Sequence, residues 1–141
     1  MSVEAYRDLS TGELADMVEI QDLFASYTHL LDIGDVAGYL SLFSADCKFI
    51  VHGRTYQGIG GVQEMVSLAE PNGVHLAASP VIRVNGDKAT SCQSFLAVRA
   101  DKKTIRMGWY EDDLTREQGR WRLAIRRVTF IRSDGSLRPP L

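Results

Sequence analysis

The sequence predicts an α+β fold in which helices from the N-terminal half lie on the concave face of a curved, mostly antiparallel sheet. Apolar residues recur at helical spacing before residue 70 and alternate with a period of two after residue 73. Helices that come first and strands that come last form separate layers, with the helices covering one face of the sheet. A strongly curved sheet closed by helices leaves a cone whose open end can hold a ligand.

The helical part begins with a long amphipathic helix at residues 13–33. Ser10 and Glu13 have the spacing of a capping box, and Gly34 supplies the left-handed residue at which helices end. We interpret residues 1–9 as a loosely ordered arm. The apolar stripe of the helix consists of Leu14, Met17, Ile20, Leu23, Phe24, Tyr27, Leu30 and Leu31.

Shorter elements connect this helix to the strand-rich half of the chain. They are a short helix capped by Asp35 and two strands joined at a tight turn, at residues 36–43, 47–51 and 54–57. The glycine-rich run at 58–61 lacks the lysine of a phosphate-binding loop, so we interpret it as a structural turn. A third helix follows at 62–70 and ends at Pro71-Asn72-Gly73.

Four long strands joined by short turns make an antiparallel meander in the rest of the chain. We expect them at residues 74–84, 88–99, 104–114 and 120–131. The Asn-Gly-Asp turn at 85–87 is a strong hairpin signal, and the segment after 131 has no regular pattern. Because the sequence contains neither a repeat nor a linker, we expect a single domain at 1–141 with its core at about 13–131.

Composition and charge narrow the classes of function. The 141 residues are 45% hydrophobic and 24% charged, and no apolar run reaches the ~20 residues of a membrane span. The polar start of the chain lacks a signal peptide, so we expect a cytoplasmic protein without a membrane partner. Residues 1–75 hold three Lys/Arg and eleven Asp/Glu, and residues 76–141 hold thirteen and seven. The basic residues alternate with apolar ones along strands, which argues against a nucleic-acid partner.

The cysteines and histidines show no metal or redox motif. Cys47 and Cys92 fall in strand-like runs without CxxC spacing, so we expect buried free thiols. Three scattered histidines lack ligand spacing, so we expect neither a metal nor another cofactor. His29 lies on the polar side of the first helix and should be exposed. His52 lies at a hairpin turn, where it is either solvated or at the rim of a pocket.

Two polar side chains lie where the apolar stripe of the first helix meets its end. Tyr27 is on the stripe itself, whereas Asp32 is ~140° round an ideal helix from Tyr27, which favours a surface position. Only an irregular helix end at Gly34, or a sheet that wraps around the helix, brings Asp32 into a shared pocket.

Four segments together resemble the SnoaL-like branch of the nuclear transport factor 2-like superfamily. They are IQDLFASYTHLLDIGD, LFSADCKF, GVHLAASPVIRVNGDKATS and GWYEDDLTREQGRWRLAIRRV, within about residues 13–131. This branch includes scytalone dehydratase, bile-acid 7α-dehydratase, hexachlorocyclohexane dehydrochlorinase and polyketide cyclases. The resemblance implies a cone-shaped fold with three N-terminal-half helices on the concave face of the sheet. It also implies a homo-dimer or homo-trimer formed through the sheet.

The resemblance also implies a catalytic site. In the dehydratases and the dehydrochlorinase a carboxylate at the end of the first helix pairs with a histidine on a meander strand, and these positions match Asp32 and His75. In the bile-acid enzyme a tyrosine joins them, and Tyr27 matches it. Gln93 stands where scytalone dehydratase has a second histidine, and Arg106 stands where that enzyme has an asparagine, so the sequence departs from that pattern.

Strand parity adds two further side chains to the implied substrate pocket. Tyr110 and Arg126 should face inward, with Arg127 replacing Arg126 if the register shifts by one residue.

These residue types suit acid–base catalysis. A neutral histidine, with an ordinary pKa of about 6.5, is the natural base near neutral pH. An aspartate bonded to its ring sets the tautomer, and a tyrosine hydroxyl stabilises negative charge on a substrate oxygen.

We therefore expect a cofactor-free dehydratase or isomerase whose partner is a small hydrophobic cyclic compound, such as a steroid or a polyketide. The alternatives are a non-catalytic accessory protein, like the β subunit of ring-hydroxylating dioxygenases, and a polyketide cyclase.

Overall fold

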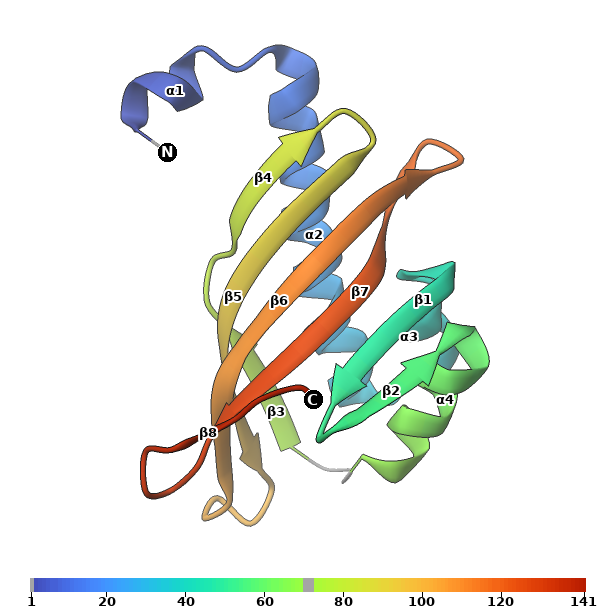
Figure 1. Ribbon diagram of the computed structural model, residues 1–141, viewed down its shortest axis with the longest axis vertical. Helices are drawn as coiled ribbons and strands as arrows, with labels where there is room; N and C mark the ends of the chain where they lie inside the picture. Colours follow the sequence, from blue (N-terminus) through green and yellow to red (C-terminus); the bar gives the residue numbers. More distant parts are fainter. Residues whose placement is uncertain (1, 70–72) are drawn as a thin grey trace.

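A computed structural model describes residues 2–69 and 73–141 of the chain, in which a curved, mostly antiparallel sheet is covered by helices (Figure 1). The described strands are β1 (Phe43–Val51), β2 (Arg54–Gln57), β3 (Gly73–Ala77), β4 (Val81–Asn85), β5 (Lys88–Arg99), β6 (Ile105–Glu117), β7 (Arg120–Ile131) and β8 (Leu137–Arg138). The described helices are α1 (Val3–Arg7), α2 (Thr11–Ile33), α3 (Val36–Leu40) and α4 (Gly58–Leu68).

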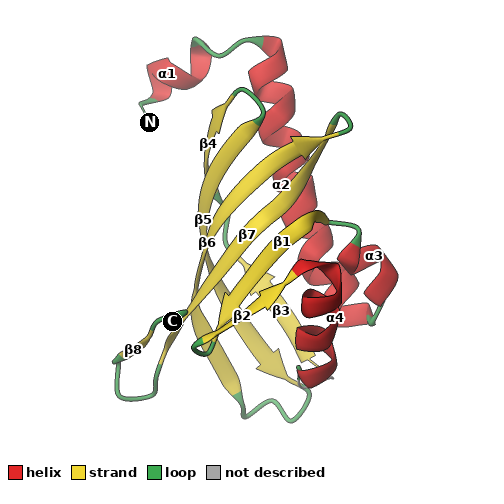
Figure 2. Ribbon diagram, turned by 45° about the vertical axis from the view of Figure 1, so that its right-hand side comes forward, coloured by secondary structure: helices red, strands yellow, loops and turns green. Residues whose placement is uncertain are grey.

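The strand order of the sheet is β2-β1-β7-β6-β5-β3, with β4 also paired to β5 and β8 to β7. Strands β5, β6 and β7 form the predicted meander, whereas β1 runs parallel to β7. Figure 2 shows α2 along one face of the sheet, with α3 and α4 beside the β1–β2 end. The α+β class and the arrangement of helices on one side of a curved sheet are therefore confirmed.

The core lies between α2 and the inner face of the sheet. Four stripe residues of α2 are buried: Ile20, Leu23, Phe24 and Tyr27. Each large apolar side chain that leaves water stabilises the fold by about 1.5–3 kcal/mol, so this stripe holds the helix to the sheet. Opposite it, the sheet contributes inward side chains that include Phe43, Cys47, Phe49, Leu114, Leu123 and Val128.

The ends of α2 are those predicted from its sequence. The Ser10 hydroxyl accepts a hydrogen bond from the Glu13 backbone N–H at 3.1 Å, and the Glu13 carboxylate accepts one from the Ser10 N–H at 2.7 Å. Gly34 ends the helix with φ 77°, and Asp35 caps α3 by accepting from the Gly38 N–H. These local hydrogen bonds set both ends of the helix that carries Tyr27 and Asp32.

The single strand expected at residues 74–84 is instead two strands, β3 and β4, and this prediction was wrong. Both pair with β5, but Pro80 in the gap has no N–H to continue the ladder. The side-chain amide of Gln93 fills part of this gap by donating to the Ala78 carbonyl at 2.6 Å. The interruption lets β3 and β4 follow different parts of the curved β5, and β3 carries His75.

Several boundaries in the helical half also differ from the prediction. Helix α3 ends at Leu40, because β1 already begins at Phe43. Helix α4 begins at Gly58, so the glycines at 58–61 form its first turn and are not a separate turn. A Cβ at Gly61 would lie 2.9 Å from the backbone of Tyr56, so this close approach to β2 requires a glycine. The predicted stop at Glu70, Pro71 and Asn72 lies outside the described residues.

The two terminal segments are more ordered than predicted. Residues 3–7 form α1, capped by Ser2, where a loose arm was expected, and none of its side chains is buried. The segment after 131 includes β8, which pairs with β7.

The two cysteines differ from one another. Cys47 is a buried thiol as predicted, and burial raises its pKa to about 11. Cys92 is exposed, because its position on β5 alternates with the buried Ser91 and Gln93, so its predicted burial was wrong. None of the described helices is long and apolar enough to cross a membrane.

Substituting the cap of α2 should test how much this helix depends on its first turn. We expect Ser10→Ala to lower the free energy of unfolding by about 1 kcal/mol, because a backbone N–H of α2 loses its acceptor. Ser2→Ala removes the equivalent bond from α1, which buries no side chain, and should change stability little. Urea denaturation measures both, and equal effects of the two substitutions would contradict this account.

Candidate active site

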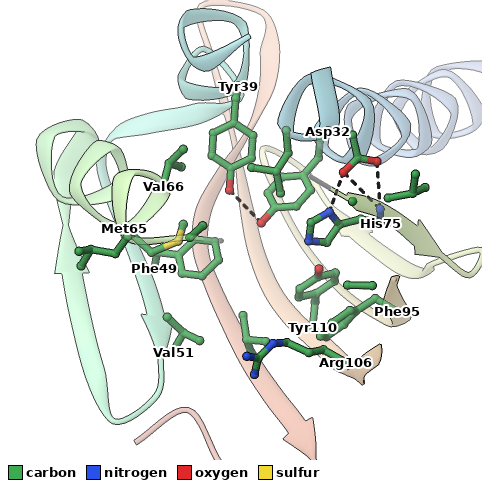
Figure 3. A pocket seen from close by; sticks show the side chains of 18 of the residues that line it. Asp32, Tyr39, Phe49, Val51, Met65, Val66, His75, Phe95, Arg106 and Tyr110 are labelled. Carbon is green, nitrogen blue, oxygen red and sulfur yellow. Dashed lines mark hydrogen bonds and ion pairs between the residues drawn. The ribbon is translucent and has the colours of Figure 1, made fainter. Parts of the chain in front are cut away.

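A cavity of about 530 Å³ lies between the helices and the inner face of the sheet (Figure 3). Most of its wall is apolar and includes Phe49, Val51, Met65, Phe95 and Phe130. Its polar groups come from separate elements, so the curvature of the sheet and the end of α2 together decide which of them meet.

His75 and Asp32 are in direct contact at this cavity. The Nδ1 atom of His75 lies 2.7 Å from Oδ1 of Asp32. The backbone N–H of His75 also donates to both oxygens of Asp32, at 3.2 and 2.9 Å. A carboxylate accepts these bonds best when Nδ1 carries a proton, which leaves Nε2 as the acceptor. In Figure 3 the second ring nitrogen of His75 points away from Asp32 into the cavity.

Strand β3 explains why Asp32 is not a surface residue. Helix α2 stays helical to Ile33, so the contact does not come from an irregular helix end. Instead β3 passes beside the last turn of α2, and the side chain of Asp32 is only 16% exposed. Asp32 and Tyr27 therefore both line the cavity, although they lie on different sides of α2.

A pair of tyrosines supplies hydroxyl groups to the same cavity. The Tyr39 hydroxyl donates to the Tyr27 hydroxyl at 2.9 Å, and both residues line the cavity. With its oxygen accepting from Tyr39, Tyr27 can donate its own proton to a bound molecule. Burial, followed by the neighbouring Tyr27, raises the pKa of Tyr39 well above its ordinary value. Tyr39 was not among the predicted site residues, because α3 has only five residues and its sequence does not show which face is inward.

Arg126 is buried beneath these tyrosines and does not line the cavity, so its placement in the substrate pocket was wrong. Its side chain is 0% exposed, and its Nε and Nη2 atoms donate to Asp112 at 2.8 Å each. The guanidinium carbon lies 3.8 Å from the ring centre of Tyr110 and 4.2 Å from that of Tyr27. Alternation along the strand correctly predicted that Arg126 points to the inner face of the sheet. It could not predict whether the side chain lies at the cavity surface or is buried below it.

The charge of Arg126 acts on the tyrosines above it. Burial alone would lower the pKa of Arg126, but the Asp112 carboxylate more than compensates and holds it above the ordinary value. Burial raises the pKa of Tyr110, as it does that of Tyr39, and Arg126 opposes both increases. A cation held against two aromatic rings favours negative charge that develops at their hydroxyl groups.

The remaining predicted pocket residues divide into two groups. Tyr110 and Arg106 line the cavity as expected, and Figure 3 shows Arg106 at the end away from Asp32. Gln93 does not line it, because its amide is held by the Ala78 carbonyl, so its inclusion was wrong. Arg127, the alternative to Arg126, pairs with Asp113 in a half-exposed position.

The other two histidines occupy the positions that their sequence context favoured. His29 is exposed on α2. His52 is exposed at the β1–β2 turn and also lines the cavity, with its ring stacked 4.8 Å from that of Phe130. Among the residues that the structure describes, no group of three or more His, Cys, Asp or Glu side chains could hold a metal ion.

The SnoaL-like domain family matches residues 12–127, most of the chain, and the protein therefore belongs to this family. An uncharacterized protein of Mycobacterium tuberculosis, Rv2910c, is 29% identical over 135 residues, covering 85% of this chain and 88% of the relative. These similarities agree with the order of segments noted in the sequence.

Solved structures similar to this chain identify the class of its fold. An NTF2-like protein with a cystatin-like fold from Novosphingobium aromaticivorans is 25% identical, with a TM-score of 0.77 over 87% of this chain and 85% of its own. A protein of that organism provisionally named scytalone dehydratase has a TM-score of 0.75 and 20% identity, covering 89% and 91%. A hexachlorocyclohexane dehydrochlorinase, LinA type 2, has a TM-score of 0.72 and 18% identity, covering 89% of both chains. The fold is thus NTF2-like.

Removing Arg126 should show how strongly the buried pair supports the site. We expect Arg126→Met to destabilise the protein by about 3–5 kcal/mol, because Asp112 is left buried without its cation. Arg127→Met breaks the neighbouring half-exposed pair and should cost about 0–1 kcal/mol. Chemical denaturation gives both values. The double change Arg126→Met with Asp112→Leu should be milder than Arg126→Met alone, and a more severe double variant would contradict this interpretation.

Proposed function

We propose that this protein is a cofactor-free acid–base enzyme that removes a proton from carbon in a hydrophobic cyclic substrate. The observation that carries the proposal is the contact of Asp32 with Nδ1 of His75, with the other ring nitrogen facing an apolar cavity. The site contains a base, a group that orients it, and a hydroxyl donor within one pocket.

The proposed reaction begins at Nε2 of His75. This atom accepts a proton from a carbon next to a substrate carbonyl, and Asp32 stabilises the imidazolium that forms. The Tyr27 hydroxyl donates to the carbonyl oxygen as negative charge develops there. The imidazolium then gives its proton to a departing hydroxyl group, which completes a dehydration, or to another carbon, which completes a double-bond migration. Both reactions use the same residues.

The wall of the cavity favours a substrate with an apolar ring system. Phe49, Val51 and Phe95 are buried core residues that also line the cavity, so a bound molecule meets a hydrocarbon surface. Water is displaced from such a surface when an apolar molecule binds. A volume of about 530 Å³ is in the usual range for small-molecule sites.

A second candidate function is a non-catalytic accessory role. It is favoured by apolar side chains exposed on β3 and β6, namely Val74, Leu76, Ile105 and Met107. Such an exposed patch is typical of a surface that meets another protein. This role gives no reason for the contact between His75 and Asp32, so we place it second. A cyclase that uses Asp32 alone as its acid–base group is less well supported, because His75 already engages that carboxylate.

Proton abstraction can be tested before the natural substrate is known. Hydrophobic cyclic ketones are incubated with the protein in D₂O, and deuterium at the carbon next to the carbonyl is followed by NMR. We expect wild-type protein to accelerate exchange, and His75→Gln to reduce this acceleration by about 10²–10⁴-fold. Asp32→Asn should reduce it by a similar or smaller factor, because the imidazole remains but loses its orienting partner.

The matched control is His29→Gln, which changes an exposed histidine on α2 and should leave exchange unaffected. Melting temperatures are measured for every variant, since a folding defect mimics lost chemistry. If His75→Gln folds normally and exchanges as fast as wild type, His75 is not the base, and the accessory role becomes the leading candidate.

Removing single hydroxyl groups should separate the two tyrosines. Tyr27→Phe is expected to slow exchange by about 10²-fold, because the donor to the developing oxyanion is lost. Tyr39→Phe breaks the same Tyr39–Tyr27 hydrogen bond but keeps the Tyr27 hydroxyl, so its rate should fall less. The exchange assay above measures both, and equal rates for the two variants would show that Tyr27 is not the donor.

A further inference from the structure

The end of the cavity away from Asp32 has basic side chains that the proposed chemistry does not use. His52 and Arg106 both line the cavity. Figure 3 shows the guanidinium group of Arg106 on the side of Val51, the residue before His52. Among the described residues that line the cavity, Asp32 is the one carboxylate, and it is engaged by His75. The side chains of His52 and Arg106 are exposed, so this end of the cavity opens to solvent, and this basic mouth contrasts with the apolar wall.

The geometry around Phe130 brings three basic residues together at this mouth. The rings of His52 and Phe130 are stacked, with centres 4.8 Å apart and planes 6° apart. Arg138 on β8 is the direct cross-strand partner of Phe130, so both side chains project from the same face of the sheet. Gly108 is its partner on β6, and Arg106, two residues earlier, shares that face. Arg106 and Arg138 thus lie on the same face of the sheet as Phe130, the ring on which His52 stacks.

The C-terminal segment is held in place at this mouth. The Gly53 N–H donates to the Pro140 carbonyl at 2.7 Å, which ties the segment after β8 to the β1–β2 turn. Arg138 is therefore positioned by two attachments, the β7 ladder on one side and this bond on the other. A cation that is already positioned loses less conformational freedom when it binds an anion.

The backbone conformation at His52 sets the position of its ring. His52 and Gly53 have φ values of 54° and 76°, as in a two-residue hairpin turn of the type that favours Asn-Gly. A left-handed backbone is uncommon outside glycine, but histidine and asparagine adopt it more often than most residues, so His52 suits this turn. The turn places its ring against Phe130, where it lines the cavity.

The charges of the two arginines converge on the imidazole of His52. Burial, followed by Arg138 and then Arg106, lowers the pKa of His52 below its ordinary value. The ring is therefore neutral near pH 7, and a neutral imidazole has one N–H to donate. Two guanidinium groups and one N–H donor form a set that suits a carboxylate, which accepts several hydrogen bonds at once.

We propose that His52, Arg106 and Arg138 bind a carboxylate group at the mouth of the cavity, and that the substrate is a hydrophobic acid whose ring system lies between this group and His75. The anion site stands on its own geometry. The placement of the reacting carbon beside His75 rests on the proposed function.

Equilibrium binding of a matched ligand pair tests the site without any turnover. The acid 2-naphthylacetate and its amide, 2-naphthylacetamide, have the same ring and nearly the same shape, but only the acid is charged at pH 7. We expect calorimetry at low salt to show wild-type protein binding the acid about tenfold more tightly than the amide, as charge-assisted hydrogen bonds predict. This preference should decrease as salt is added.

Three variants locate the preference at the mouth. The double variant Arg106→Gln with Arg138→Gln should lose most of the preference for the acid, with the affinity for the amide unchanged. His52→Asn places in the turn a residue that such turns favour, so it should fold normally and still weaken binding of the acid alone. The control, Arg120→Gln, removes one arginine charge at the β6–β7 turn, far from the mouth along β6, and should keep the wild-type preference.

The outcomes separate this site from the proposed chemistry. Equal affinity of wild-type protein for the two ligands, no binding of the acid at millimolar concentration, or an undiminished preference in the double arginine variant would each overturn the carboxylate site. His75→Gln should retain the preference, because His75 lies at the other end of the cavity. If wild-type protein prefers the acid but does not accelerate deuterium exchange, the anion site is supported and the acid–base proposal fails.

Discussion

The ion pair between Arg126 and Asp112 is the constraint around which the centre of the molecule is arranged. The two residues are direct cross-strand partners on β6 and β7, and both are removed from water. A charge at this depth is tolerated because two hydrogen bonds from the guanidinium group and one from Ser91 satisfy the carboxylate. The pair also sets the distance between Tyr27 on α2 and Tyr110 on β6, since the guanidinium group lies against both rings. The polar floor of the cavity therefore depends on a contact inside the core.

A second contact joins the helix to the edge of the sheet. His75 and Asp32 are 43 residues apart in the chain, and three interactions hold them together. They meet because β3 separates from β4 at the gap that contains Pro80 and then passes the last turn of α2. The gap between β3 and β4 is therefore what brings His75 and Asp32 to one cavity.

Basic side chains lie at both ends of the cavity, whose wall is mostly apolar apart from the tyrosine hydroxyls. A molecule that spans the cavity meets His75 at one end and Arg106 at the other. The opposite ends also differ in construction. His75 is positioned by a carboxylate, whereas His52 is positioned by a ring stack and a tight turn. Under the two proposals, this difference favours one orientation of the substrate.

The sequence alone determined the α+β class, both ends of α2, the meander and the alternation of inward and outward residues, because local hydrogen bonds and short periodicities encode these features. It also brought His75 and Asp32 together as a hypothesis through family resemblance, and the structure shows that contact. The sequence could not show how deeply an inward side chain is buried. Arg126 and Gln93 were therefore placed at the cavity, although the packing of residues distant in sequence buries them away from its wall. The stack of His52 on Phe130 was equally beyond the sequence, since 78 positions separate the two rings and only the curvature of the sheet makes them neighbours.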